Sequence, residues 1–393
     1  MLDPGVLTVW LLPLAAFSGW YLARRDRRKP DESQHGRISA DYLRGLNHLV
    51  NDEPDRAIEV FVRVLDVDND TVETHMALGN LFRRRGEVER ALRIHQNLIS
   101  RGNLKHRFRN QARFELAQDY LQAGMLDRAE DIGQELVNEG VFLQPALEHL
   151  IKIYEKERDW ERAIETSQRW EAVSGQSRRA IIAHYHCELS EEARQRGDDE
   201  RARHLLDRAL SEDRDCVRAS ILRGGLEESR GNWEEAVRAY RRVLWQNQSY
   251  LPEVLSPLER CYTAMEKLDV WLDFLKEATF RYEEAAPHIS TARLLNRMGQ
   301  PAEAASQLSE YLQITPNWVG FYYLVQLTGT TGDDTLSGPL QSLRAALGRM
   351  LESAALYQCR HCGFSGRILN WQCPRCGRWS SMLPLKDLIQ TAR

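Results

Sequence analysis

The sequence predicts an all-α protein: an array of helix pairs (an α-solenoid), preceded by one apolar helix and followed by a small metal-binding module. Three observations lead to this prediction. Residues 4–23 contain no charged side chain, a helical pattern recurs about every 34 residues, and four of the seven cysteines fall within residues 359–376.

The first element is the uncharged run Pro4–Ala23, which is long enough to cross about 30 Å of hydrocarbon as a helix. Five cations follow it in Arg24–Lys29 and none precedes it, a pattern that places the rest of the chain in the cytoplasm. A cleaved signal peptide would instead need a basic stretch before the run. We therefore expect a single-pass transmembrane anchor over residues 1–23 and a basic juxtamembrane linker over 24–36. An ordinary buried helix is the alternative.

Residues 37–330 repeat a helix–turn–helix pattern, with a small residue at one equivalent point of each copy. Seven of the eight aligned positions are alanine: Ala57, Ala91, Ala129, Ala163, Ala202, Ala236, Trp271 and Ala304. The steps between them are 34, 38, 34, 39, 34, 35 and 33 residues. This period is typical of the tetratricopeptide repeat, in which a small residue lets two helices cross closely.

Two departures from this period predict local changes in the array. The long steps indicate inserted loops within residues 100–107 and 174–180. The bulk of Trp271 indicates a distorted or wider repeat. After Pro316 the pattern weakens, and we expect a linker and one helix over residues 331–356.

The first helices of such repeats line a concave groove that binds segments of other proteins. Repeat position assigns six polar residues of the second and third repeats to this groove: Glu73, Asn80, Arg83, Arg84, Gln118 and Gln122. Each of them could equally be a solvated surface residue.

The cysteines predict a metal site in the last segment, residues 357–393. Cys359 and Cys362 form one C-x-x-C-G sequence, and Cys373 and Cys376 form a second. Each is typical of a knuckle in which two thiolates face one ion, so the pair predicts a tetrahedral site for one zinc or iron ion. Two disulfides, or four unrelated thiols, are the alternative. So small a module cannot fold on apolar burial alone, and we expect the metal to supply its folding energy.

The aromatic residues Phe364, Trp371 and Trp379 lie in and around these knuckles. We expect them to pack within the module, with docking as the other possibility. The module itself is expected to dock against the end of the array or against a partner.

Charge and the remaining motifs constrain the function. The net charge is −4, made of +3 in residues 1–29, +5 in residues 357–393 and −12 between them. The three other cysteines are scattered, which indicates a reducing compartment. No phosphate-binding loop, H-E-x-x-H sequence or dinucleotide fingerprint occurs, so we expect a protein that is not an enzyme.

Two stretches carry a resemblance to a known family: "LGNLFRRRGEVERALRIHQ" (78–96) and "CRHCGFSGRILNWQCPRCGRWS" (359–380). The second is similar to rubredoxin, most clearly in "CPRCG" (373–377). With the anchor and the repeats, the chain resembles the lipopolysaccharide assembly protein B family of the Gram-negative inner membrane. The resemblance implies metal binding by the four cysteines, and an adaptor that helps a membrane AAA+ zinc protease degrade the lipid A deacetylase. It also implies that the protein gathers lipopolysaccharide-synthesis or transport proteins.

Two other functions stay open. An iron-loaded module would suit an electron-transfer protein of the rubredoxin type, and a basic zinc ribbon would suit nucleic-acid binding. We expect protein partners and a membrane, not nucleic acid. The choice between iron and zinc is open, and so is a homo-oligomer.

Overall fold

The computed structural model describes residues 72–102, 104–282, 284–328 and 337–385, with a few isolated positions before residue 72. The chain divides into two compact units, Met1–Phe142 and Leu143–Arg393. The predicted anchor, the basic linker and the first repeat around Ala57 lie outside the described residues, isolated positions aside. Within the described part of the chain, no helix combines the length and the apolar character needed to cross a membrane.

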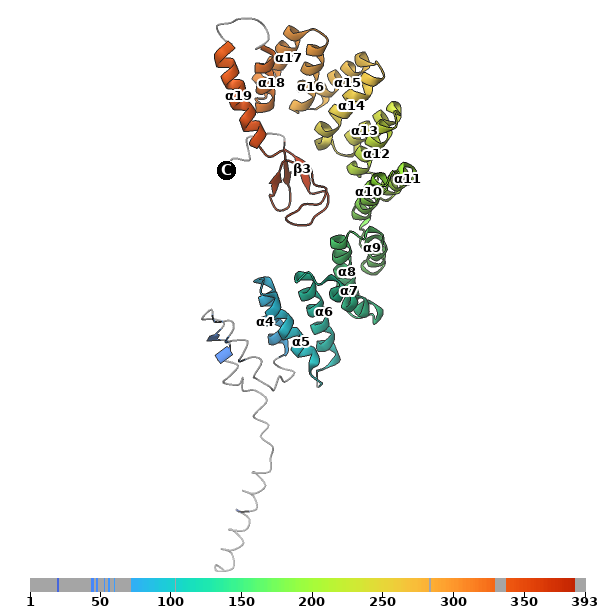
Figure 1. The fold of residues 1–393 in the computed structure, drawn as a ribbon, viewed down its shortest axis with the longest axis vertical. Coiled ribbons are helices and arrows are strands. Elements are labelled where there is room, and N and C mark those ends of the chain that lie inside the picture. Colours follow the sequence, from blue (N-terminus) through green and yellow to red (C-terminus); the bar gives the residue numbers. More distant parts are fainter. Residues whose placement is uncertain are drawn as a thin grey trace, which may run out of the picture. The chain divides into compact units, whose positions relative to one another are not determined.

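The described part of the first unit contains two antiparallel helix pairs (Figure 1). They are α4 (Val72–Arg84) with α5 (Val88–Ser100), and α6 (His106–Gln122) with α7 (Leu126–Asn138). Apolar side chains recur on the facing sides of these helices and are buried between them. The most deeply buried are Val72, Met76, Phe82, Ala91, Leu98, Ala112, Ala117, Ala129 and Leu136.

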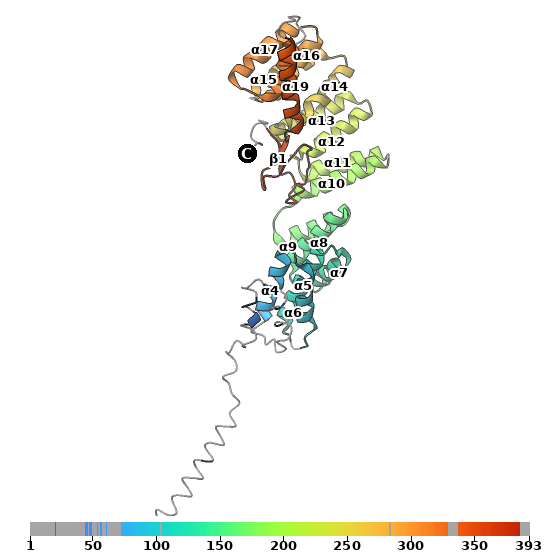
Figure 2. The ribbon, with the colours of Figure 1, turned by 60° about the vertical axis from the view of Figure 1, so that its left-hand side comes forward.

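The second unit continues the same pattern with further helix pairs (Figures 1 and 2). The helices are α8 (Leu143–Glu157), α9 (Trp160–Ser174), α10 (Arg179–Gln195), α11 (Asp199–Glu212), α12 (Val217–Ser229), α13 (Trp233–Gln246), α14 (Leu251–Ala264), α15 (Leu268–Arg281), α16 (Ala285–Arg297), α17 (Pro301–Ile314), α18 (Trp318–Thr328) and α19 (Ser337–Ser353). A short 3-10 helix, η2 (Gln248–Tyr250), precedes α14. The predicted tetratricopeptide-repeat solenoid is confirmed.

One residue with a left-handed backbone joins the two helices of each pair from α4 to α17. These residues are Gly86, Gly124, Arg158, Gly197, Gly231, Glu266 and Gly299. At Gly197, φ is +79°, and the amide of Asp198 donates to the carbonyl of Ala193 at 2.9 Å, which closes the end of α10. Glycine adopts this conformation without the steric cost that other residues meet, so its recurrence marks the turn within each repeat.

The aligned small residues lie where the two helices of a pair cross. The six alanines that the structure describes are at most 1% exposed: Ala91, Ala129, Ala163, Ala202, Ala236 and Ala304. Trp271 is also fully buried, with its ring between those of Tyr262 (5.5 Å) and Phe274 (5.3 Å). Helices α14 and α15 contact each other less than the helices of any other pair from α4 to α17. The prediction of a distorted or wider repeat at Trp271 is therefore confirmed.

The prediction of inserted loops at the two long steps is wrong in its placement. The connection between α9 and α10 (175–178) is as long as those between α7 and α8 (139–142) and between α11 and α12 (213–216), and the connection between α5 and α6 (101–105) is only slightly longer. The extra length is mainly helical, because α6 and α10 have 17 residues each, more than the first helices of the other described pairs.

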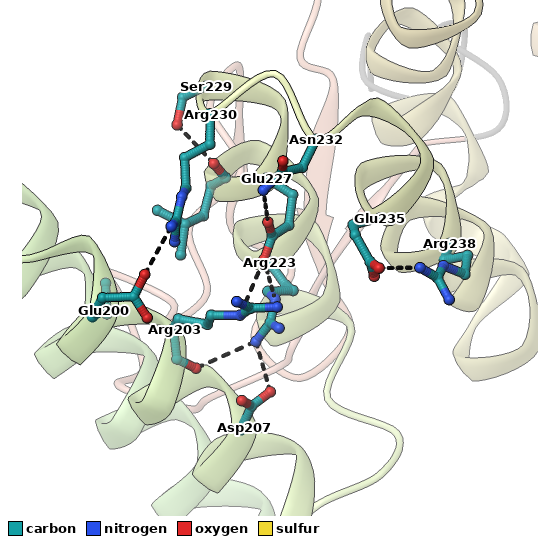
Figure 3. Close-up of polar contacts among 12 residues, drawn as sticks. Glu200, Arg203, Asp207, Arg223, Glu227, Ser229, Arg230, Asn232, Glu235 and Arg238 are labelled. Carbon is teal, nitrogen blue, oxygen red and sulfur yellow. Dashed lines mark hydrogen bonds and ion pairs between the residues drawn. The ribbon is translucent and has the colours of Figure 1, made fainter.

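A buried carboxylate joins neighbouring repeats (Figure 3). Glu227 of α12 accepts hydrogen bonds from Asn232 Nδ2 and Arg223 Nε, both at 2.9 Å, and lies 3.3 Å from Arg203 Nε of α11. Arg223 also reaches Asp207 of α11 at 2.6 Å. Burial raises the pKa of Glu227, but the hydrogen bond from Asn232 and the two arginines outweigh it, and the pKa is lowered overall. The pairing fixes α12 against α11.

The described part of the chain ends in a small sheet. Its antiparallel strands β1 (Tyr357–Cys359), β2 (Ser365–Gly366) and β3 (Met382–Pro384) have the order β2-β1-β3. In both ribbon views this module lies beside α10 to α14 (Figures 1 and 2).

Candidate metal centre and its contact with the array

The two C-x-x-C-G sequences fold into matching knuckles. Gly363 and Gly377 have φ of +72° and +67°, and their amides donate to the carbonyls of Cys359 (3.0 Å) and Cys373 (2.8 Å). This turn brings the two cysteines of each pair to the same side. The four thiols meet in one cluster, as the sequence predicted.

The sulfur positions fit a tetrahedral metal ion. A bond of about 2.3 Å to each sulfur gives a tetrahedron with edges of about 3.8 Å. The Sγ atoms of Cys359 and Cys376 are 3.8 Å apart, those of Cys362 and Cys373 are 3.7 Å apart, and all four lie within 4.8 Å of one another. These separations are too long for disulfides, and the cysteines that the structure describes are free. The donor set suits zinc or a single iron.

Hydrogen bonds at the sulfur of Cys359 favour the thiolate that a metal needs. The side chain of Ser381, with its oxygen 3.4 Å from the Cys359 sulfur, lowers the pKa of that thiol to about 6. The backbone amides of Cys362 and His361 act in the same direction. At Cys362 the backbone amide of Phe364 acts in the same direction, but burial and the neighbouring thiols outweigh it and raise the pKa to about 11.

The module is packed onto the array through Trp379, which follows the second knuckle. Its indole Nε1 donates to Glu155 Oε1 of α8 at 2.8 Å. Its ring stacks on His184 at 5.0 Å and meets Tyr185 edge-on at 5.8 Å and Trp160 edge-on at 6.2 Å. A single module residue therefore contacts three helices of the array, α8, α9 and α10.

A second contact lies on η2 and the start of α14. Trp371 stacks on Tyr250 at 5.4 Å, and the hydroxyl of Tyr250 donates to the carbonyl of Met382 in β3 at 2.8 Å. Leu383 belongs to the same apolar core as the residues of α12 to α15. Burial raises the pKa of Tyr250 to about 12, so its hydroxyl stays a hydrogen-bond donor at neutral pH.

A buried carboxylate closes this side of the interface. The hydroxyl of Tyr357 in β1 donates to Glu253 Oε1 of α14 at 2.6 Å. Burial raises the pKa of Glu253, and the hydrogen bond from Tyr357 opposes that change. The carboxylate is held at the interface by a donor from the module.

The docking corrects two expectations. The module lies against α8, α10 and α14, not at the end of the array. Trp371 and Trp379 pack on the array, and only Phe364 packs with the cysteine cluster inside the module. The sequence analysis missed Glu155, His184 and Tyr185, because each is an ordinary helix residue whose role depends on a contact distant in sequence. A signal was present in the module, which has more large aromatic side chains than so small a core can bury.

The six predicted groove residues occupy different environments in the first unit. Arg83 is 15% exposed at its side chain and is held by Glu115 (2.6 Å) and Asp119 (2.8 Å) of α6. Glu73, Arg84 and Gln122 are exposed, whereas Asn80 and Gln118 are half-buried. Partner binding by these residues stays a prediction, and Arg83 has a structural role that the sequence did not reveal.

Comparison with known proteins places the chain in a family. A model described as the rubredoxin metal binding domain matches residues 357–384, and the tetratricopeptide repeat matches residues 42–99 and 187–252. Lipopolysaccharide assembly protein B of Escherichia coli strain K12 is 34% identical over 379 residues, covering 96% of this chain and 97% of that protein. The chain belongs to the lipopolysaccharide assembly protein B family.

A relative from another organism agrees with this family. Lipopolysaccharide assembly protein B of Haemophilus influenzae is 32% identical over 387 residues, covering 96% of this chain and 97% of that protein. Among solved structures, the crystal structure of MamA protein covers 47% of this chain and 96% of its own, with 18% identity and a TM-score of 0.33. The resemblance drawn from the two quoted sequence stretches is confirmed.

Proposed function

We propose that this protein is a scaffold, not an enzyme, that acts in lipopolysaccharide assembly at the bacterial inner membrane. The uncharged segment Pro4–Ala23 anchors it, and the array and module lie on the cytoplasmic side. In this proposal the array binds two kinds of partner, a membrane AAA+ zinc protease and the lipid A deacetylase that the protease degrades. It also gathers lipopolysaccharide-synthesis or transport proteins.

The contact between module and array is the observation that carries the proposal. Glu155, His184 and Tyr250 lie on or next to the first helices of their repeats, the helices that line the protein-binding face of such arrays. The metal module is therefore part of that face. Four protein thiolates close the coordination shell of the ion, which suits a structural metal and leaves no position for a reacting water.

The test measures the half-life of the deacetylase in cells that carry either the intact chain or variants at native abundance. Removing residues 4–23 should leave a folded protein that no longer shortens this half-life, because it no longer meets membrane-bound partners. Crosslinking in the membrane should capture the protease with the intact chain and not with the truncated one. Normal deacetylase turnover with the truncated chain would refute the membrane-tethered adaptor.

The groove is tested with Arg84 and Arg83 separately. Arg84→Glu changes an exposed charge and should weaken partner capture without lowering helicity. Arg83→Glu would place a third carboxylate beside Glu115 and Asp119, so it should cost about 3–5 kcal/mol of stability and does not test binding. Unchanged partner capture with Arg84→Glu would show that Arg84 is a solvated surface residue with no role in binding.

The metal is tested by exchange. Zinc-loaded and iron-loaded protein should support the same deacetylase turnover if the site is structural. A folded, metal-exchanged protein that has lost activity would favour the electron-transfer alternative.

A further inference from the structure

A cavity of about 350 Å³ lies where the second knuckle meets helices α8 and α10. Residues 148, 151, 152 and 155 contribute from one side of α8, at the i, i+3, i+4, i+7 spacing of a single helix face. Arg178 and Ile181 contribute from the start of α10, and residues 377–379 contribute from the module. The cavity exists only where the module is docked, because each of the two parts supplies some of its walls.

The cavity has an apolar part. Ile151 is buried and Ile181 half-buried, and both line the cavity together with Trp379. Apolar walls of this kind can cover one or two aliphatic or aromatic side chains of a bound segment. The volume lies at the small end of the range of about 300–1,000 Å³ that ligand pockets occupy.

The acidic groups of the cavity already accept hydrogen bonds. Glu155 accepts from the indole of Trp379 at 2.8 Å and from the hydroxyl of Tyr185 at 2.6 Å. Glu148 accepts from the indole of Trp170 at 3.0 Å. These carboxylates are therefore engaged in holding the walls together.

The basic side chains of the cavity have no charged partner in the described part of the chain. Lys152 and Arg378 are exposed, and Arg178 is half-buried with its guanidinium 4.1 Å from the centre of the Trp170 ring. None of the three side chains forms an ion pair with a residue in the described part of the chain. These three cations can therefore bind a negatively charged hydrogen-bond acceptor next to the apolar part of the cavity.

The geometry points to a binding site for a short peptide segment of a partner protein that carries a carboxylate beside an apolar side chain. The apolar side chain sits over Ile151, Ile181 and Trp379, and the carboxylate binds Lys152, Arg178 and Arg378. The carboxylate belongs to an Asp or Glu side chain or to a chain terminus. This site deepens the proposed scaffold function and rests on it, because it names the kind of segment that the scaffold recognises.

The test uses the metal-loaded chain without residues 1–36 and a random nonapeptide library displayed on phage. Sequences that are enriched should carry Asp or Glu within two positions of Leu, Ile or Phe. A synthetic enriched peptide should bind about tenfold more weakly when its Asp or Glu is replaced by Asn or Gln, because charged contacts in such a cleft account for about that factor. Peptides with a free carboxyl end and with an amidated end distinguish a chain terminus from a side chain.

Two double variants, each of which replaces two cations by glutamate, test the site with the same change in net charge. Lys152→Glu with Arg378→Glu should reduce peptide binding by at least about tenfold. Lys156→Glu with Arg179→Glu changes two exposed cations of α8 and α10 that lie outside the cavity walls, and binding should be as in the unmodified chain. Circular dichroism and metal content show that both double variants are folded, and Lys152→Gln with Arg378→Gln replaces the first if it is not.

Selection without acidic enrichment would overturn the site, and so would equal loss of binding in both double variants. The outcome is separable from that of the scaffold proposal. Normal deacetylase turnover without the anchor refutes the scaffold while leaving the peptide measurements intact, whereas loss of acidic selection refutes the site and leaves the scaffold.

Discussion

Replacing Trp379 by alanine should release the metal module from the array without unfolding either part. The change removes the ring that stacks on His184 and packs against Tyr185 and Trp160. It also removes the indole that donates a hydrogen bond to Glu155. Glu155 still accepts a hydrogen bond from the hydroxyl of Tyr185.

The size of the effect follows from these contacts. A buried tryptophan costs about 3–5 kcal/mol on truncation to alanine. Trp379 is half-buried, so about 2–3 kcal/mol is expected from packing, and the lost hydrogen bond adds about 1 kcal/mol. A total of about 3 kcal/mol corresponds to a change of more than about a hundredfold in the docking equilibrium.

Native-state hydrogen exchange is the assay. Amides of residues 377–385 should exchange about a hundredfold faster in Trp379→Ala, while metal content and helicity stay unchanged, because the four thiolates and the helix pairs are intact. Trp245→Ala is the matched control: Trp245 is 77% exposed and far in sequence from these contacts, so exchange in the module should not change. If the amides of residues 377–385 exchange at the same rate in Trp379→Ala and Trp245→Ala, the contacts of Trp379 do not hold the module on the array.

Further predictions concern the metal, a turn and a buried histidine. Cys373→Ser should lose the metal and unfold the module with little loss of helicity, measured by metal analysis and circular dichroism, whereas Cys261→Ser should keep the metal. Gly197→Ala should lower the free energy of unfolding by about 1–2 kcal/mol, because its φ is +79° and its added Cβ would contact nothing. Gly102→Ala, where φ is not left-handed, should be close to neutral, and equal urea midpoints for both variants would refute the strain argument. Burial, assisted by Arg218, lowers the pKa of His184 to about 3. The unfolded chain therefore takes up a proton below pH 6.5 that the folded chain does not, so stability should fall as the pH falls, by about 1.4 kcal/mol per pH unit below 6. Burial also lowers the pKa of His186 to about 4, so His184→Gln should reduce the fall of the urea midpoint between pH 6 and 5 without abolishing it, and an unchanged slope would contradict this assignment.

The array and the cysteine cluster could be predicted because their signals are local or periodic. An alanine every 34 residues or so reports a helix crossing, and C-x-x-C-G reports a knuckle whatever surrounds it. Even the exception at Trp271 could be interpreted from its size alone.

The docking could not be predicted from the sequence in the same way. The Trp379 to Glu155 hydrogen bond joins residues 224 positions apart, and Glu155 has no feature that distinguishes it from other helix carboxylates. The structural role of Arg83 was hidden for the same reason, since its partners lie on the next repeat. Contacts of this kind depend on how far the array curves, which a single repeat does not specify.

The docked module also changes how the array can deform. A solenoid whose repeats touch only their neighbours behaves as a spring, with curvature that is soft and unfolding that proceeds repeat by repeat. Here one rigid, metal-bonded body is attached both to Glu155 in α8 and to Glu253 in α14, so it ties together repeats that are not adjacent. The docked module therefore restrains the movement of α8 and α14 relative to each other. With metal bound, α8 to α14 should stretch and unfold as one stiff block, and removing the ion should return them to a compliant chain. Occupancy of a four-sulfur site would then set the mechanical compliance of a protein-binding surface.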